Sequence, residues 1–285
     1  MTNSQTMGIT QPTLDSKAER IIAKVFAWTR VLLMTTVWVS AGLFGLYILA
    51  FYAAALYQGN LERWNEILPG LYDQSTRKAT MGIGLHFAMG GIILILGSIQ
   101  LIDTIRVKYL TFHRWVGRIY VVASILVAIG GLIFIAIKGT IGGIVMNIGF
   151  GLYGVLMLLA AVQTYKYAVA HDTETHRAWA LRLYALAIGS WLYRMDYGFW
   201  FLLADKAGHN NTFTGIFDYI MAFFFYIPNL LVAEIFIRSQ NSRKMSIWLN
   251  LAFTIVLLVM ISFLLLGTYY FTKFYWGPAI VGWLF

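Results

Sequence analysis

The chain has 285 residues, of which 60% are hydrophobic and 12% are charged, about half the charged fraction of an ordinary soluble domain. It contains no cysteine, which excludes disulfides, thiolate catalysis, and zinc or iron–sulfur sites held by cysteine. The formal net charge is +9. Because the apolar residues form long blocks, we relate this charge to membrane orientation and expect no nucleic-acid partner.

The first 30 residues differ from the rest of the chain. Met1 to Ser16 is polar and lacks the short apolar core and small-residue cleavage site of a secretory signal peptide. We therefore interpret residues 1–30 as a cytoplasmic tail with an amphipathic lead-in, and we expect this segment to be retained.

Seven apolar segments follow, each long enough to cross a bilayer, which takes about 20 apolar residues. They run without the polar–apolar alternation of barrel strands, so helices are predicted. Pro228 should kink the sixth segment. The fold class predicted is all-α: a polytopic transmembrane bundle over residues 31–271, with a short apolar tail at 272–285. The seven segments are residues 31–57, 80–102, 115–137, 143–165, 178–203, 215–237 and 246–271.

The positions of Lys and Arg predict the orientation. Of the 21 such residues, fourteen fall on the side of the N-terminus, six fall on the other side, and Arg194 lies inside the fifth segment. Basic residues accumulate on the cytoplasmic side of membrane proteins. The bias therefore predicts a cytoplasmic N-terminus and an outside C-terminus.

Two similar polar motifs open the third and fifth segments. The third begins His-Arg-Trp-Val-Gly-Arg-Ile-Tyr at His113, and the fifth begins His-Arg-Ala-Trp-Ala-Leu-Arg-Leu-Tyr at His176. The similarity of the two motifs indicates that the second to fifth segments are two related helical hairpins that form a four-helix core. The cations of this inner cluster are Arg114, Arg118, Arg177 and Arg182.

The inner cluster places cations at helix N-termini, which already carry partial positive charge. Something anionic must compensate: lipid phosphates, a carboxylate or phosphate ligand, haem propionates, or protein carboxylates. The same positive field favours neutral imidazole at His113 and His176, the form that binds haem iron. Two ordinary interpretations stay open: arginines that extend to lipid head groups, and histidines in interfacial hydrogen bonds. The nearby carboxylates are Asp103, Asp172, Glu174 and Glu234.

A second cluster of ionisable residues is expected nearer the outer side, from His86 on the second segment and Arg194 and Asp196 on the fifth. Ionisable groups inside a membrane are functional candidates by default. Such a group could relay protons, line a polar pocket, or pack without further function. Arg194 and Asp196 are two residues apart and so do not share a helix face. His209, in a short outer loop, carries no functional signal.

Glycine is frequent in the second and fourth segments, for example at Gly82, Gly91, Gly149 and Gly154. Small residues let transmembrane helices approach closely. We therefore expect these faces to be packing surfaces and the two segments to approach each other.

Several of these features together resemble a family of predicted bacterial membrane proteins of unknown function. The resemblance rests on His86, the stretch from Gly97 through Gln100 to Arg106, the block that begins at His113, and Thr175-His176-Arg177 with Arg182. It covers roughly the second to the sixth segment. It implies a multi-pass protein of the bacterial inner membrane.

The arrangement of histidines also resembles, more weakly, that of b561-type cytochromes, in which histidines on facing helices of a four-helix core hold two haems. The resemblance implies that His113 and His176 ligate one haem b near one membrane face. The second pair is missing, because the fourth segment offers no histidine opposite His86; Asn147 is its nearest polar residue in depth.

Three functions remain open at this point. The first is a membrane redox protein that holds haem b and exchanges electrons with a quinone or a membrane partner protein. The second is a transporter or a lipid- or anion-binding protein that uses the inner arginines, with anionic lipid head groups as partners. The third is a structural or assembly subunit of a membrane complex. The chain lacks a P-loop, a Gly-x-Ser-x-Gly elbow and a His-Glu-x-x-His motif, so the enzyme classes that use them are excluded.

Overall fold

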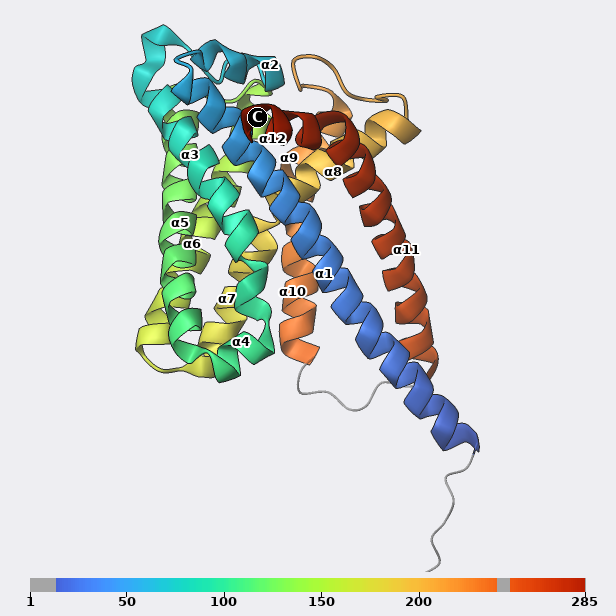
Figure 1. Cartoon of the computed structure of the whole chain (residues 1–285). Helices are drawn as coiled ribbons and strands as arrows, with labels where there is room; N and C mark the ends of the chain where they lie inside the picture. Colours follow the sequence, from blue (N-terminus) through green and yellow to red (C-terminus); the bar gives the residue numbers. More distant parts are fainter. Residues whose placement is uncertain (1–13, 240–246, 285) are drawn as a thin grey trace, which may run out of the picture.

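The computed structural model describes residues 14–239 and 247–284, and every regular element within them is helical (Figure 1). The predicted all-α bundle is therefore confirmed. The elements are α1 (Leu14–Tyr57), η1 (Leu61–Arg63), α2 (Trp64–Ile67), η2 (Gln74–Thr76), α3 (Arg77–Leu96), η3 (Ser98–Leu101), α4 (Asp103–Lys108), α5 (Leu110–Ile137), α6 (Gly143–Val169), α7 (Thr173–Ala187), α8 (Gly189–Leu203), α9 (Ile216–Phe224), α10 (Ile227–Ser239), α11 (Ile247–Phe271), the π-helix η4 (Thr272–Trp276) and α12 (Gly277–Leu284).

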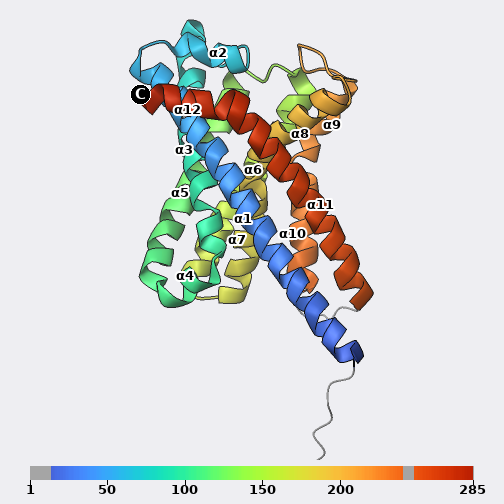
Figure 2. The same cartoon turned by 45° about the vertical axis from the view of Figure 1, so that its right-hand side comes forward.

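Six stretches of the described chain are long and apolar enough to cross a membrane. They correspond to six of the seven predicted segments, and the protein is a multi-pass membrane protein. We call the two ends of the bundle the α4 end and the α2 end, after the short helices that lie there (Figures 1 and 2). The six stretches are Lys17–Tyr57, Gln74–Leu101, Leu110–Ile137, Gly143–Val169, Ile216–Arg238 and Ile247–Gly282.

The remaining predicted segment, residues 178–203, is divided between α7 and α8, which have 15 residues each. Each is shorter than the roughly 20 residues that a crossing needs. The two helices follow each other through Ile188 and together run from the α4 end to the α2 end (Figures 1 and 2). The predicted single helix is thus a broken one.

Two other elements differ from simple apolar helices. α1 begins at Leu14, well before the apolar segment 31–57, because the polar lead-in continues the same helix. The sixth segment breaks between α9 and α10, immediately before Pro228, which has no N–H to donate. The predicted kink at Pro228 is confirmed. Residues 1–13 lie outside the described part of the chain.

The predicted four-helix core is present and has a definite order. α3 packs against α5, α5 against α6, and α6 against α7, while α3 and α7 share few contacts. α5 and α7 therefore lie diagonally across this core. α1 packs against α3 and against α11. Toward the α4 end, α1 and α11 diverge from α5 (Figures 1 and 2).

Glycine determines how closely these helices approach. A Cβ on Gly130 of α5 would lie 2.5 Å from the carbonyl oxygen of Gly82 on α3, and one on Gly149 of α6 would lie 2.5 Å from that of Ala222 on α9. Real side chains do not tolerate such distances, so both contacts require glycine. The glycine faces are packing surfaces as predicted, but each meets a different neighbour; the second and fourth segments are not direct partners.

Candidate functional site

The predicted pair His113 and His176 lies at the α4 end of the four-helix core. His113 is in the first turn of α5 and His176 in the first turn of α7, the two helices that face each other diagonally. His176, Arg106 and Arg114 lie near enough to His113 to influence it electrostatically, and Arg106 is itself paired with Asp103 at 2.7 Å. The structure therefore brings the two histidines together with part of the predicted arginine set.

The orientation of His176 is fixed by a backbone carbonyl. Its Nδ1 lies 2.9 Å from the carbonyl oxygen of Thr164, near the end of α6, so Nδ1 donates, and in a neutral imidazole Nε2 would be the acceptor. The start of α7 is held by Asp172, whose carboxylate accepts from the N–H of Thr175 at 3.0 Å. Hydrogen bonds from the Thr175 backbone and side chain hold the pKa of Asp172 below its ordinary value.

Three buried polar atoms near His113 have no hydrogen-bond partner within the described residues: Gln100 Nε2, His113 Nδ1 and Tyr120 OH. His113, Gly117 and Tyr120 are spaced four and three residues apart and so lie on one face of α5. Gln100 reaches this face from η3, because its Oε1 lies 3.1 Å from the position of a Cβ on Gly117. The three unpartnered atoms thus belong to one polar stripe, which we call the α5 stripe.

The α5 stripe continues into the core. Tyr120 is 5% exposed and lies about 10 Å along the helix from His113, at about 1.5 Å per residue. Its ring meets that of Tyr184 beside Gly97, where a Cβ would lie 3.2 Å from each ring. The hydroxyl of Tyr184 already has a partner, Ser98 Oγ at 2.8 Å. Of these two tyrosines that contact Gly97, Tyr184 thus has a partner for its hydroxyl and Tyr120 has none among the described residues.

The predicted arginines divide into paired and exposed groups. Glu234 Oε2 accepts from Nε and Nη2 of Arg182 at 3.0 and 2.7 Å, so a protein carboxylate compensates this cation. Arg118 stacks on the ring of Trp115 at 5.2 Å. Arg114 and Arg177 are exposed and form no ion pair within residues 14–239 and 247–284. These two remain available to an anion from outside the chain.

The members of the second predicted cluster interact with different neighbours. His86 Nδ1 bonds to the carbonyl oxygen of Val127 at 2.9 Å, across the α3–α5 contact. Arg194 faces α1, where its charge acts on Tyr47 and Tyr52. Among the described residues, no hydrogen bond or ion pair joins His86 to Arg194 or to Asp196. The grouping of these three residues into one site stays a prediction.

A polar cluster that the sequence analysis missed lies at the α2 end. Asp218 of α9 is 0% exposed. Its Oδ1 accepts from Tyr197 OH and from His209 Nδ1, each at 2.7 Å. Its Oδ2 accepts from the backbone N–H groups of Asn210 at 3.3 Å and Gly215 at 3.0 Å. All three side chains of this Asp218 cluster are thus joined in one hydrogen-bonded network.

The loop between α8 and α9 closes over the Asp218 cluster. Phe201 and Phe213 pack their rings against His209, with centroids 4.8 and 5.0 Å away. Lys206 and Phe213 have φ angles of 60° and 54°, a backbone region that residues other than glycine rarely adopt. One signal was present in the sequence: Asp218 is the single carboxylate in the first two turns of an otherwise apolar segment.

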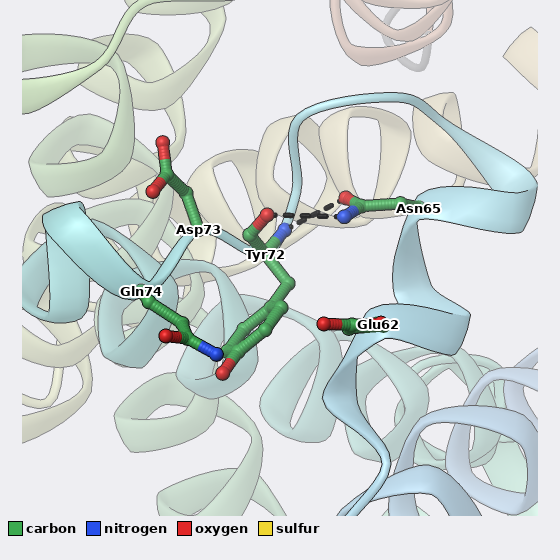
Figure 3. A pocket seen from close by; sticks show the side chains of 5 residues that line it. All are labelled: Glu62, Asn65, Tyr72, Asp73 and Gln74. Carbon is green, nitrogen blue, oxygen red and sulfur yellow. Dashed lines mark hydrogen bonds between the residues drawn. The ribbon is translucent and has the colours of Figure 1, made fainter.

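An open pocket of about 510 Å³ lies in the loop that holds α2 (Figure 3). Asn65 exchanges hydrogen bonds with the backbone of Tyr72 at 2.9 and 3.0 Å and so shapes one wall. Asp73 bonds to Ser75 and pairs with Lys138 at 3.1 Å, which lowers the pKa of its carboxyl to about 2. The negative charge of the Asp73 carboxylate is therefore already compensated by Lys138. Glu62 and Gln74 complete the lining.

The described part of the chain has no group of three or more His, Asp or Glu side chains that could hold a metal ion. A haem needs no such group, because one or two axial ligands hold its iron.

Comparison with known proteins supports the membrane assignment and adds no activity. A family model described as "Predicted membrane protein (DUF2306)" matches residues 83–237, which is more than half of the chain. No curated protein and no solved structure matches. The matched region runs from α3 to α10, and therefore includes both the α5 stripe and the Asp218 cluster.

Proposed function

For this chain, which belongs to the DUF2306 family of predicted membrane proteins of unknown function, we propose the binding of an amphiphile at the α4 end of the four-helix core. The amphiphile carries an anionic, oxygen-bearing head group. The Lys and Arg bias supports a cytoplasmic location for this end, with the protein in a bacterial inner membrane.

The observation that carries this proposal is the set of unpartnered atoms on the α5 stripe. More than nine in ten buried polar groups in native proteins have a hydrogen-bond partner. Each one left without a partner costs about 1–3 kcal/mol. Three unpartnered atoms along one face of α5 therefore favour a partner that is not part of the chain.

The chemistry of the stripe indicates what this partner offers. Gln100 Nε2 and Tyr120 OH are donors, and His113 Nδ1 donates in one tautomer. Donors require acceptor oxygens, such as those of a carboxylate, a phosphate or a carbonyl. The charge of Arg114, which has no ion-pair partner among the described residues, acts at the same place and favours an anion, whereas Arg106 is already paired with Asp103 at 2.7 Å. Because the stripe extends about 10 Å along α5, the ligand is elongated and enters the core.

The test is to identify what the purified protein retains in mild detergent, by native mass spectrometry followed by solvent extraction. We expect an acidic amphiphile on the wild type and about a tenfold lower retention in the double variant Gln100→Leu/Tyr120→Phe, since two hydrogen bonds are removed. Tyr226→Phe is the matched control, because its hydroxyl bonds to Gly149 O at 3.2 Å within the protein. Equal loss in both variants would contradict the proposal.

A second candidate is haem b held between His113 and His176. Iron-ligating histidines normally donate their other ring N–H to a carbonyl or carboxylate. His176 does so to Thr164, whereas His113 Nδ1 has no such partner, so half of the expected arrangement is present. Arg114 and Arg177 are the cations free to hold propionates. Bound haem would supply one-electron chemistry, with a quinone or a partner protein as the other redox centre.

An absorption spectrum separates the two candidates. Haem predicts a Soret band whose loss follows His113→Ala or His176→Ala, while His86→Ala keeps it because His86 bonds elsewhere. A colourless protein, expressed with sufficient haem and still retaining an acidic amphiphile, rejects the haem candidate and leaves the first proposal standing.

A further inference from the structure

The last helical stretch ends in an irregular turn. α11 continues through the π-helix η4 into α12, which lies across the α2 end (Figures 1 and 2). Single π-turns inside helices occur frequently at functional sites. Beside this one runs an open, mostly apolar groove of about 460 Å³, lined by Leu265, Thr268, Tyr269, Thr272 and Lys273.

Thr272 differs from the other hydroxyl residues of the peripheral helices. Five of them on α1 and α11 donate to the carbonyl four residues earlier, and for Thr268 that distance is 2.6 Å. Thr272, where the helix widens, has a buried Oγ1 with no hydrogen-bond partner in the described chain. Thr272 lines the groove, and its hydroxyl is an unused donor next to it.

Lys273 is the single charged residue between Ile247 and Leu284. Its ammonium lies 3.3 Å from the hydroxyl of Tyr269 and near the rings of Tyr269 and Phe274, at 5.6 and 5.3 Å from their centroids. Within residues 14–239 and 247–284 it pairs with no carboxylate. A lysine at a membrane interface extends its charge toward lipid phosphates.

From these observations we propose that the α11–η4 groove binds an anionic phospholipid from the leaflet at the α2 end. Lys273 contacts the phosphate, the hydroxyl of Thr272 donates to an ester carbonyl, and one acyl chain lies along Leu265 and Tyr269. The last two are 53% and 57% exposed and face lipid. The volume of the groove falls within the usual range for small-molecule sites, about 300–1,000 Å³.

The test uses nanodiscs with equal amounts of phosphatidylglycerol and phosphatidylcholine. Native mass spectrometry counts the lipids that stay on the released protein. We expect phosphatidylglycerol to be retained preferentially, with about fivefold less retention in Lys273→Gln and about threefold less in Thr272→Val. Equal retention of both lipids in the wild type, or no change in either variant, would overturn the proposal.

Two matched controls and a positional readout separate this groove from the α4 end. Thr254→Val removes a hydroxyl that is already bonded to Asn250 O at 2.7 Å, and Lys206→Gln removes an exposed cation at the same end. Neither should change retention. A photoactivatable phosphatidylglycerol should label the peptide that contains residues 265–273 in the wild type and much less in Lys273→Gln. Labelling confined to α5 peptides would place the lipid at the other site and reject this one.

Discussion

Two polar clusters at opposite ends of this protein, the Asp218 cluster and the α5 stripe, hold buried polar groups of similar kind in opposite states. At the α2 end, the carboxylate of Asp218 accepts from four donors. In the α5 stripe at the α4 end, Gln100, His113 and Tyr120 each have a buried atom without a hydrogen-bond partner among the described residues. A satisfied network rigidifies the part of the fold that contains it. An incomplete network favours a partner from outside, so the comparison supports a structural role for the Asp218 cluster and the proposed ligand site at the α5 stripe.

The largest effect is expected from Asp218→Ala. It leaves Tyr197, His209 and two backbone N–H groups without an acceptor, so the free energy of unfolding should fall by about 3–5 kcal/mol. Denaturation in mixed detergent micelles measures it. A loss below about 1 kcal/mol would mean that the network does not support the fold, and the contrast between the ends would disappear.

A smaller effect is expected at the α4 end from Glu234→Gln, which weakens the pair with Arg182 and the bond to Arg238 at 2.8 Å. Both partners of the first pair are partly exposed, so the loss should be about 1 kcal/mol or less. Arg238→Gln is the control, since its side chain is 79% exposed and should contribute less. A loss as large as that for Asp218→Ala would show that burial does not decide these energies.

The smallest effect is expected from the partly exposed pair of Asp73 and Lys138. The folded-state pKa of Asp73, about 2, is below the ordinary 3.8. The pair therefore stabilises the protein above about pH 4 and loses this contribution as the pH falls toward 2. In Asp73→Asn, the decline in unfolding free energy over this window should become shallower. An unchanged decline would remove Asp73 as its source.

The sequence predicted the membrane helices because continuous apolar blocks leave the backbone few alternatives in lipid. It also predicted that His113 and His176 lie at one end, since equivalent motifs open two helices that start on the same side. Glu234 was among the carboxylates expected near the inner arginines, and it pairs with Arg182.

What the sequence could not predict depends on partners chosen by tertiary packing. Gly82 and Gly149 were recognised as packing positions, but the helices that face them follow from the whole bundle. The Asp218 cluster depends on a loop with left-handed residues at Lys206 and Phe213, a conformation that these residue types do not favour. In the sequence, His209 is a polar residue in a short loop. Only the fold places it against the buried carboxylate of Asp218.

The central claim is that the hydroxyl of Tyr197 has a hydrogen-bond partner within the protein, whereas that of Tyr120 has none among the described residues. A matched pair of substitutions tests this claim most directly. In ligand-stripped protein, Tyr197→Phe removes a hydrogen bond to a charged group and should lower the free energy of unfolding by about 1.5–3 kcal/mol. Tyr120→Phe removes an unpartnered buried hydroxyl and should raise that free energy, by up to about 1–3 kcal/mol. If Tyr120→Phe destabilises the stripped protein as much as Tyr197→Phe does, Tyr120 already has its partner within the protein, and the ligand site at the α4 end is contradicted.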